Sequence, residues 1–436
     1  MTLTRFPHHP PILSLPHPAY RSILLDNGIR LMLVQDLTST STAASMSVSV
    51  GASSDPHGQM CGVAHFCEHM CFLGSAAYPV ENHYKKTLAL HNGHSNASTS
   101  MERTVFKFDV DAGAFETLFD IFHNFFISPT FSADGTKREV NAVDSENSKN
   151  LTSDDRRRLQ ILKALAVSTP SRYLNFSTGN TATLVPSADS TPPGVDPIDV
   201  TRRSLLYFHS LHYTSDRMAC CIVGPQSLDE LAAISIPRLE RIPVRHPLKS
   251  STDDGSTLPP PPIKAAFDDA FAVVPRLESS RDAAVAAPSA ASAGGASPSL
   301  PPPAVAFISS FPTPFPFVLT VNPLRTQRVL ALLFPAPPSR HLKDRSPSRL
   351  VSHILGHEGA GSAFASLQDL GLATALGTGS RMSDGNQTLF EVELTLTQEG
   401  EDRWQDVVRI LFDHIELLRT TAETNPERLA QQWGEV

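Results

Sequence analysis

The sequence predicts an α+β fold: two similar layered domains, each a mostly antiparallel sheet with helices packed on one face. Three observations predict it. Segments such as residues 44–50, ASMSVSV, alternate apolar and polar side chains with period two, which indicates half-buried strands. Segments such as residues 114–126 carry apolar side chains at helical spacing. The same mixture of strands and helices returns after a proline- and serine-rich break, so we expect two layered domains.

The first domain begins with a predicted hairpin. Residues 22–34, SILLDNGIRLMLV, hold two apolar runs around Asn27-Gly28, a pair that favours a tight turn between strands. Beyond the strand at 44–50, the spacing of apolar residues predicts helices and further strands. We expect helices at 62–73, 80–92, 114–126 and within 134–166, and strands at 95–100, 104–110 and 219–224.

Composition shifts divide the chain. Residues 1–20 read as an N-terminal tail, 21–243 as the first domain, 244–262 as a proline- and serine-rich linker, and 263–436 as a structurally related second domain. An Ala/Ser/Pro/Gly insertion at about 278–303 is expected to be disordered, because it has too little apolar surface to bury. The second domain is predicted to hold helices at 347–373 and 401–420 and a strand at 389–397. We expect it to be incomplete, because its last helical segment ends without a cap.

Composition bears on three questions: nucleic-acid binding, redox compartment and membrane insertion. A net charge of −8 does not suggest a nucleic-acid-binding protein, because such domains normally carry a basic face. The five cysteines are few and odd in number, which favours a reducing compartment over a disulfide framework. No run approaches the roughly 18 apolar residues that span a bilayer. We expect a cytoplasmic protein with no membrane insertion, and the sequence leaves mitochondrial or peroxisomal targeting open.

Residues 65–75, HFCEHMCFLGS, hold the densest group of potential metal ligands. His65 and His69 are four residues apart, so a helix presents both on one face, where they could share a metal ion. Glu68 lies between them and could act as a base beside that ion. This H-x-x-E-H order is the inverse of H-E-x-x-H, and both supply two imidazoles and a carboxylate.

A catalytic zinc site needs a third protein ligand. Glu139 and Glu146 are seven residues apart, so they share a face of the helix predicted within 134–166, and either could reach the metal. The five-residue motif alone also fits an ordinary amphipathic helix with partly exposed histidines. Cys67 and Cys71 are best explained as small buried side chains, because their spacing is unlike that of C-x-x-C zinc pairs.

Several longer motifs, in order, resemble the pitrilysin family of zinc metallopeptidases, and within it the insulin-degrading (insulysin) branch. They are GVAHFCEHMCFLGSAAYP, HNGHSNASTSMERTVFKFDV, REVNAVDSENSKN, FSTGNTATL, FPAPP and HILGHEGAGSAFASLQDLG. The resemblance makes 21–243 the catalytic domain. It implies that one Zn²⁺ per chain is held by His65, His69 and Glu146, that Glu68 is the general base, and that Glu139 orients the site.

The resemblance also implies where a peptide substrate would bind. Asn96 and Ala97 would lie on the edge strand that pairs with an extended peptide. The stretches HEGAGS and LGTGS would anchor the amino terminus of the substrate in the second domain, with glycines that allow a close approach of its backbone. The glycines concerned are Gly359, Gly361, Gly377 and Gly379. Without the resemblance, these stretches would be interpreted as a polar strand edge, a helix cap and a tight turn.

The chain departs from the family pattern in length and in several residues. Ser98 stands where relatives place an aromatic side chain, Arg156 and Leu159 stand where they place Trp and Phe, and Ala360 replaces a proline. Only the first half of an insulysin-type enzyme is present. Two functions therefore stay open: a zinc metalloendopeptidase, or a non-catalytic half that binds zinc or peptide. Either could need a C-terminal half or a second copy of the chain as a partner.

Overall fold

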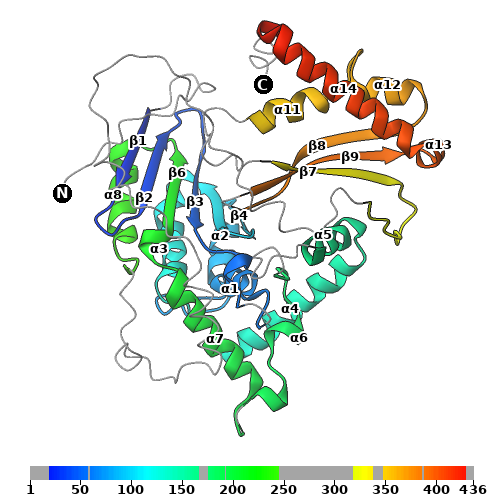
Figure 1. Cartoon of the computed structure of the whole chain (residues 1–436). Coiled ribbons are helices and arrows are strands. Elements are labelled where there is room, and N and C mark those ends of the chain that lie inside the picture. The colour runs from blue at the N-terminus through cyan, green and yellow to red at the C-terminus, as the bar shows by residue number, and fades with distance from the viewer. Residues whose placement is uncertain are drawn as a thin grey trace, which may run out of the picture. The chain divides into compact units, whose positions relative to one another are not determined.

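A computed structural model describes residues 19–56, 59–165, 175–191, 193–244, 318–336, 347–384 and 387–428 (Figure 1). Contacts between residues divide them into two compact units. Unit 1 contains the described residues up to 152, 159–164 and 175–244, and unit 2 contains 153–158, 165 and those from 318 onward. The predicted linker beyond residue 244, the insertion at 278–303 and residues 1–18 of the predicted tail lie outside the described residues.

Unit 1 is built on a six-stranded sheet with strand order β1-β2-β6-β3-β5-β4. Neighbouring strands are antiparallel except β2 and β6, which are parallel. The predicted hairpin around Asn27-Gly28 is confirmed, because β1 pairs with β2 on either side of it. The strands are β1 (Ala19–Leu24), β2 (Arg30–Gln35), β3 (Ser41–Val48), β4 (His94–Thr99), β5 (Thr104–Asp111) and β6 (Met218–Gly224).

The core of unit 1 lies between one face of this sheet and its helices. Alternate residues of β3, β5 and β6 are buried, and they join the buried residues of α1, α3, α7 and α8 in one hydrophobic cluster. This agrees with the predicted layered α+β fold. The helices are α1 (Val63–Cys71), α2 (His83–Leu90), α3 (Phe115–His123), α4 (Ala133–Leu151), α5 (Asp154–Leu165), α6 (Thr181–Leu184), α7 (Pro197–His212) and α8 (Leu228–Leu239).

Helices α6, α7 and α8 of unit 1 were not predicted, although the sequence carries start signals for the two longer ones. Asp196 caps α7 by accepting a hydrogen bond from the Ile198 amide, and Pro197 occupies the first turn. Ser227 and Glu230 form a capping box at the start of α8. The helical pattern at 134–166 proves to be two helices, α4 and α5, separated by a break at residues 152–153.

The buried side chain of His209 on α7 gives the fold a pH dependence. Burial lowers the pKa of His209 to about 4, although its ring donates a 3.0 Å hydrogen bond to the Phe125 carbonyl. An unfolded histidine titrates near 6.5, so between pH 6.5 and 4 the unfolded chain binds a proton that the folded chain does not. Stability is therefore lost as the pH falls through this window, by about 3 kcal/mol from this residue at most.

We expect His209→Gln to flatten this acid limb. Denaturant unfolding at pH 7 and pH 5 should show a smaller loss of stability on acidification in the variant than in the parent. His94→Gln, at a side chain that is 85% exposed, is the matched control and should keep the acid limb of the parent. Identical pH profiles for the parent and His209→Gln would contradict the assignment.

Unit 2 contains a three-stranded antiparallel sheet with strand order β7-β9-β8. Its strands are β7 (Val329–Ala336), β8 (Ala373–Asp384) and β9 (Gln387–Leu396), and its helices are α11 (Pro347–Leu355), α12 (Ala363–Asp369), α13 (Gln398–Asp402) and α14 (Trp404–Thr424). Buried residues of α11, α12, α14, β8 and β9 form a second hydrophobic cluster. Strand β8 was not predicted; the LGTGS stretch lies inside it and is not a turn.

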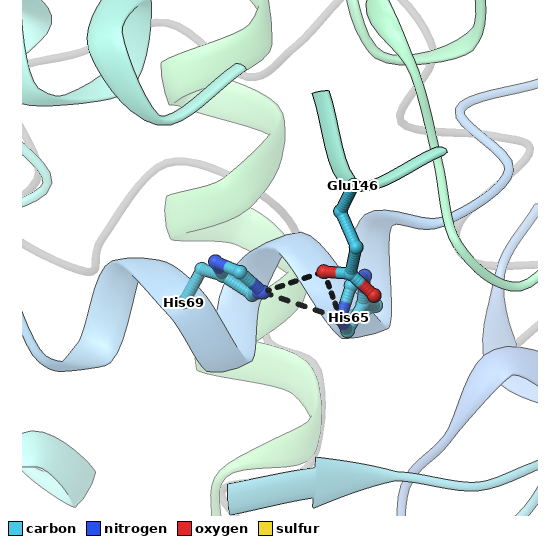
Figure 2. Close-up of side chains that lie close together, drawn as sticks. All are labelled: His65, His69 and Glu146. Atoms are coloured by element: carbon cyan, nitrogen blue, oxygen red, sulfur yellow. Dashed lines mark hydrogen bonds and ion pairs between the residues drawn. The ribbon is translucent and has the colours of Figure 1, made fainter. Parts of the chain in front are cut away.

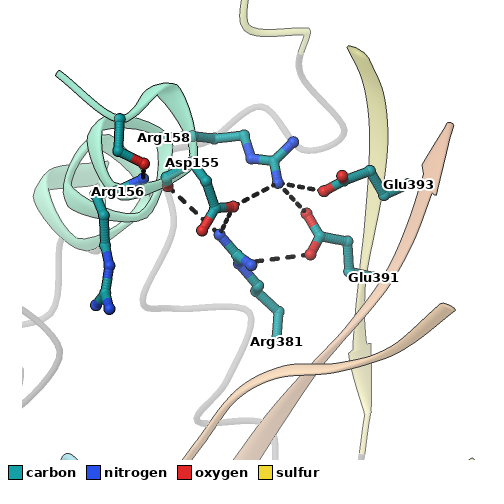
Figure 3. Close-up of polar contacts among 7 residues, drawn as sticks. Asp155, Arg156, Arg158, Arg381, Glu391 and Glu393 are labelled. Carbon is teal, nitrogen blue, oxygen red and sulfur yellow. Dashed lines mark hydrogen bonds and ion pairs between the residues drawn. The ribbon is translucent and has the colours of Figure 1, made fainter. Parts of the chain in front are cut away.

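A network of charged side chains joins residues 153–158 to the sheet of unit 2 (Figure 3). Arg158 contacts Asp155, Glu391 and Glu393, and Arg381 contacts Asp155 and Glu391. The Glu391 side chain is only 9% exposed. Burial raises the pKa of Glu391, and the two arginines oppose that shift. Each arginine thus bridges two carboxylate-bearing segments, the start of α5 and strand β9.

Among the described residues, no helix has both the length and the apolar character needed to cross a membrane.

Candidate metal centre

Helix α1 is mostly buried, and two histidines lie on its accessible side. Phe66, Cys67, Met70 and Cys71 are fully buried and belong to the unit 1 core, which agrees with the predicted packing role of the two cysteines. His65 and His69 are not part of this core; their side chains are 14% and 24% exposed. The apolar spacing of α1 therefore turns both imidazoles toward the same accessible side.

Helix α4 places Glu146 opposite these histidines (Figure 2). The Nε2 atoms of His65 and His69 are 3.2 Å apart, and each is 3.7 Å from Oε2 of Glu146. Among the described residues, this is the group of three His, Cys, Asp or Glu side chains whose ligand atoms converge as a metal site requires. The structure thus brings together the three residues that the sequence predicted as ligands.

The outer ring nitrogens show which atoms are free to bind a cation. Nδ1 of His65 lies 2.7 Å from the Thr178 carbonyl, which can only accept, so Nδ1 carries the proton. Nδ1 of His69 lies 2.7 Å from Oε1 of Glu139. In the neutral imidazoles both Nε2 lone pairs then face Glu146 with no hydrogen between them. Two nitrogens and a carboxylate are the donor set of many catalytic zinc sites, so these residues fit Zn²⁺.

The carboxylates around His69 favour a positive charge at this place, whether it is a proton or a bound cation. Burial alone would lower the pKa of His69, but the hydrogen bond and charge of Glu139, with the charges of Glu68 and Glu146, raise it above its ordinary value. The hydrogen bond to His69 in turn holds the pKa of Glu139 below its usual range, so Glu139 is ionised. An ionised acceptor on Nδ1 orients the ring and makes Nε2 a stronger ligand.

Glu68 is buried beside the histidines, with 6% of its surface exposed. Burial raises the pKa of Glu68, while a hydrogen bond from Thr99 and the nearby His65 and His69 lower it. Thr99, at the end of β4, donates its hydroxyl proton to Oε2 of Glu68. Thr99 was not among the predicted site residues. The signal that could have found it is its place on the strand segment 95–100, two residues from Ala97 and therefore on the same face.

The predicted substrate residues lie in both units. Asn96 is exposed and Ala97 half-buried on β4, which is an edge strand of the six-stranded sheet. In unit 2, Gly359 lines a pocket, whereas Gly361, Gly377 and Gly379 do not belong to its lining. Gly377 and Gly379 lie on β8, paired with Glu393 and Glu391 of β9. The residues that line the pocket are Ser352, His353, Gly356, His357, Glu358, Gly359, Leu376 and Thr378.

Comparison with known proteins identifies related sequences. The sequence pattern of the insulinase family, peptidase family M16, matches residues 30–168, and that of the peptidase M16 inactive domain matches residues 199–431. Insulin-degrading enzyme-like 1, peroxisomal, from Arabidopsis thaliana is 35% identical over 402 residues, which cover 92% of this chain and 35% of that protein. The insulin-degrading enzyme of Homo sapiens is 32% identical over 400 residues, covering 92% and 33%. The chain spans about a third of the length of these relatives.

Solved structures show the same fold. The crystal structure of pitrilysin superposes with a TM-score of 0.67 at 23% identity, covering 94% of this chain and 37% of that chain. A protease from Helicobacter pylori superposes with a TM-score of 0.63 at 16% identity, covering 95% and 86%. His65, Glu68, His69 and Glu146 all lie within the segment that matches the insulinase pattern. The chain belongs to the M16 (insulinase) family of peptidases.

Proposed function

We propose that this chain is a zinc-dependent metalloendopeptidase that binds one Zn²⁺ through His65, His69 and Glu146 and uses Glu68 as its general base. The convergence of the two Nε2 atoms and Oε2 of Glu146 supports this proposal most directly. Glu68 supports hydrolysis in particular, because a site that only stored metal would have no need of a buried carboxylate beside its ligands.

Each side chain has a distinct task in this proposal. When bound, Zn²⁺ supplies Lewis acidity, which makes water acidic enough to ionise near neutral pH and stabilises negative charge on a carbonyl oxygen. Glu68 accepts the proton of the attacking water and delivers it to the leaving amine. Thr99 holds the carboxylate of Glu68 in one orientation. Thr178 and Glu139 hold the rings of His65 and His69.

The substrate proposed is an extended peptide. On β4 the backbone groups that face away from β5 could pair with such a peptide, and this would place Asn96 and Ala97 next to it. The unit 2 pocket that contains Gly359 is proposed to hold the amino terminus of a substrate, with Gly361, Gly377 and Gly379 on neighbouring backbone. Glu358 lines this pocket and would supply the negative charge that such an amine requires.

Partners and compartment are also proposals. The chain spans about a third of the length of its curated relatives. We therefore propose that a C-terminal half or a second copy of the chain completes the substrate-binding site. All five cysteines are free thiols, which supports a reducing compartment, and we propose the cytoplasm. One relative is named as peroxisomal, so fractionation of cells should include peroxisomes.

The experiment is a turnover assay with an internally quenched peptide that keeps its free amino terminus, combined with metal analysis of the purified chain. We expect close to one zinc per chain, loss of cleavage on chelation, and recovery when Zn²⁺ is added back. Cleavage that persists in metal-free protein would overturn the proposal. One bound zinc without cleavage, by the chain alone or mixed with a C-terminal half, would instead support the non-catalytic alternative.

Thr99→Val tests how the base is held. The substitution preserves the shape of the side chain and removes the hydroxyl that donates to Glu68. A hydrogen bond to a charged group contributes about 1.5–3 kcal/mol, so we expect turnover to fall by about tenfold or more while the metal content is unchanged. The control is Thr40→Val, which removes a hydroxyl from the loop before β3 and should leave turnover unchanged. Parent-like turnover in Thr99→Val would exclude this role.

A further inference from the structure

The start of α1 lacks a cap of its own. Its N-cap residue is Gly62, which has no side chain, and there is no acidic residue in the first turn. Gly62 has a φ of +93°, and a Cβ there would lie 2.3 Å from the Cα of Gly179, so no other residue fits. The first amides of this helix therefore need an acceptor from elsewhere in the chain, because a buried amide without a partner is costly.

Asp55 supplies that acceptor. Its Oδ2 accepts a 2.6 Å hydrogen bond from the Gly62 amide, and its Oδ1 accepts a 2.9 Å hydrogen bond from the Ala64 amide. Only 2% of Asp55 is exposed. Both carboxylate oxygens thus bind amides of the first turn of α1. His65 follows Ala64 directly, so it lies on this turn.

Two buried residues, Lys163 and Asn175, hold the segment of Asp55 in place by hydrogen bonds. Lys163, 3% exposed, donates from Nζ to the Asn175 carbonyl at 3.1 Å and to Oγ of Ser177 at 3.0 Å. Asn175 donates from Nδ2 to the backbone carbonyls of Ala52 and Asp55, at 2.9 and 3.2 Å. Burial raises the pKa of Asp55 to about 8, and the hydrogen bonds from the Gly62 and Ala64 amides, followed by the positive charge of Lys163, oppose that rise. The three residues are thus connected through the backbone carbonyls of Asn175 and Asp55, and we call them the Asp55 network.

The same network reaches His65 a second time. Thr178 follows Ser177 directly, and its carbonyl accepts a 2.7 Å hydrogen bond from Nδ1 of His65. The backbone before His65 and the outer nitrogen of its ring are therefore both held by segments that the network joins. His69 is held differently, by Glu139 of α4. The two imidazoles thus depend on separate supports.

We infer that Asp55, held in place by Lys163 and Asn175, is a positioning residue that orients His65 toward the metal. The inference rests on the proposed function, in which His65 is a ligand. Asp55 contacts neither metal nor substrate in this assignment; it acts through the amides of α1. Its loss is expected to loosen His65 and to leave His69 in place.

The test compares Asp55→Ala with Asp196→Ala, which removes a side-chain cap from α7. Zinc affinity is measured by competition with a chelator, and folding by circular dichroism and thermal unfolding. We expect Asp55→Ala to bind zinc about tenfold or more weakly, the range found when residues that support metal ligands are lost. Asp196→Ala should lower stability and leave zinc affinity unchanged. Asp55→Asn, which keeps one acceptor oxygen, should recover part of the affinity.

Imidazole ¹⁵N NMR of the metal-free chain tests the inference without zinc. In the parent we expect one protected Nδ1–H signal from His65, and in Asp55→Ala its loss, with the His69 signal unchanged. Equal zinc affinity in Asp55→Ala and the parent would overturn the inference, and so would an undisturbed His65 signal. If the parent itself bound no zinc, the proposed function would fail, and the NMR result would still decide the role of Asp55. If Asp55→Ala does not fold, Asp55→Asn and Asn175→Ala carry both measurements.

Discussion

Glu68→Gln is expected to leave the chain folded and loaded with metal, and to lower peptide cleavage by about 10²–10⁴-fold, the contribution usual for a general base. The amide keeps the size of the side chain and can still accept the hydrogen bond from Thr99. It has no basic oxygen to take the proton of water, so the loss should appear in kcat. The metal ligands are untouched, so one zinc per chain should remain.

The measurement is kcat and KM on a quenched peptide, with metal analysis of the same sample. Glu240→Gln makes the same chemical change at an exposed residue after α8 and should behave as the parent. A Glu68→Gln protein with parent activity would remove Glu68 from the mechanism. A protein that had lost its metal would show instead that Glu68 supports the ligands.

The double substitution His65→Ala, His69→Ala should abolish stoichiometric zinc binding. Loss of a residue that only supports a ligand costs about 10–100-fold in metal affinity, and loss of two ligands should cost more than this. Glu139→Gln, which alters the partner of Nδ1 in His69, is expected to fall inside that smaller range. The ordering of these variants therefore separates the residues that bind the ion from the one that orients a ring.

Zinc affinity is again measured by chelator competition. His94→Ala is the matched control, because this exposed histidine lies outside the convergent group. Zinc bound at parent affinity by the double variant would refute the assignment of the ligands. Loss of zinc from His94→Ala as well would point to a site elsewhere on the surface of unit 1.

The sequence predicted the local parts of the structure better than the distant ones. The spacing of His65 and His69 follows from one helix, so the motif sufficed to place both on one face. The seven-residue spacing of Glu139 and Glu146 put both on one side of α4 and left open which would reach the metal. The structure brings Glu146 to both Nε2 atoms and Glu139 to an outer nitrogen. That distinction depends on how α4 packs against α1, which local spacing does not encode.

The supports of the site could not be predicted for the same reason. The Thr178 carbonyl is 113 residues from His65, and a backbone acceptor has no residue type to recognise. Thr99 lies in the predicted strand 95–100, which was expected to bind the substrate and not to hold Glu68. Strand β8 was missed because the glycines of LGTGS disfavour strands, and pairing with β9 overrides that preference. In each case tertiary contacts decide what local preference leaves open.

The assignment of residues 153–158 to unit 2 has a consequence for dissecting this protein. Chain segments on both sides of this stretch belong to unit 1, so no single cut yields two intact folding modules. A fragment that ends near residue 244 would keep Arg158 and lose its partners on β9. The complementary fragment would keep the buried Glu391 with Arg381 as its remaining arginine. The two units are thus interlaced along the chain, and we expect neither to fold fully as a separately expressed fragment.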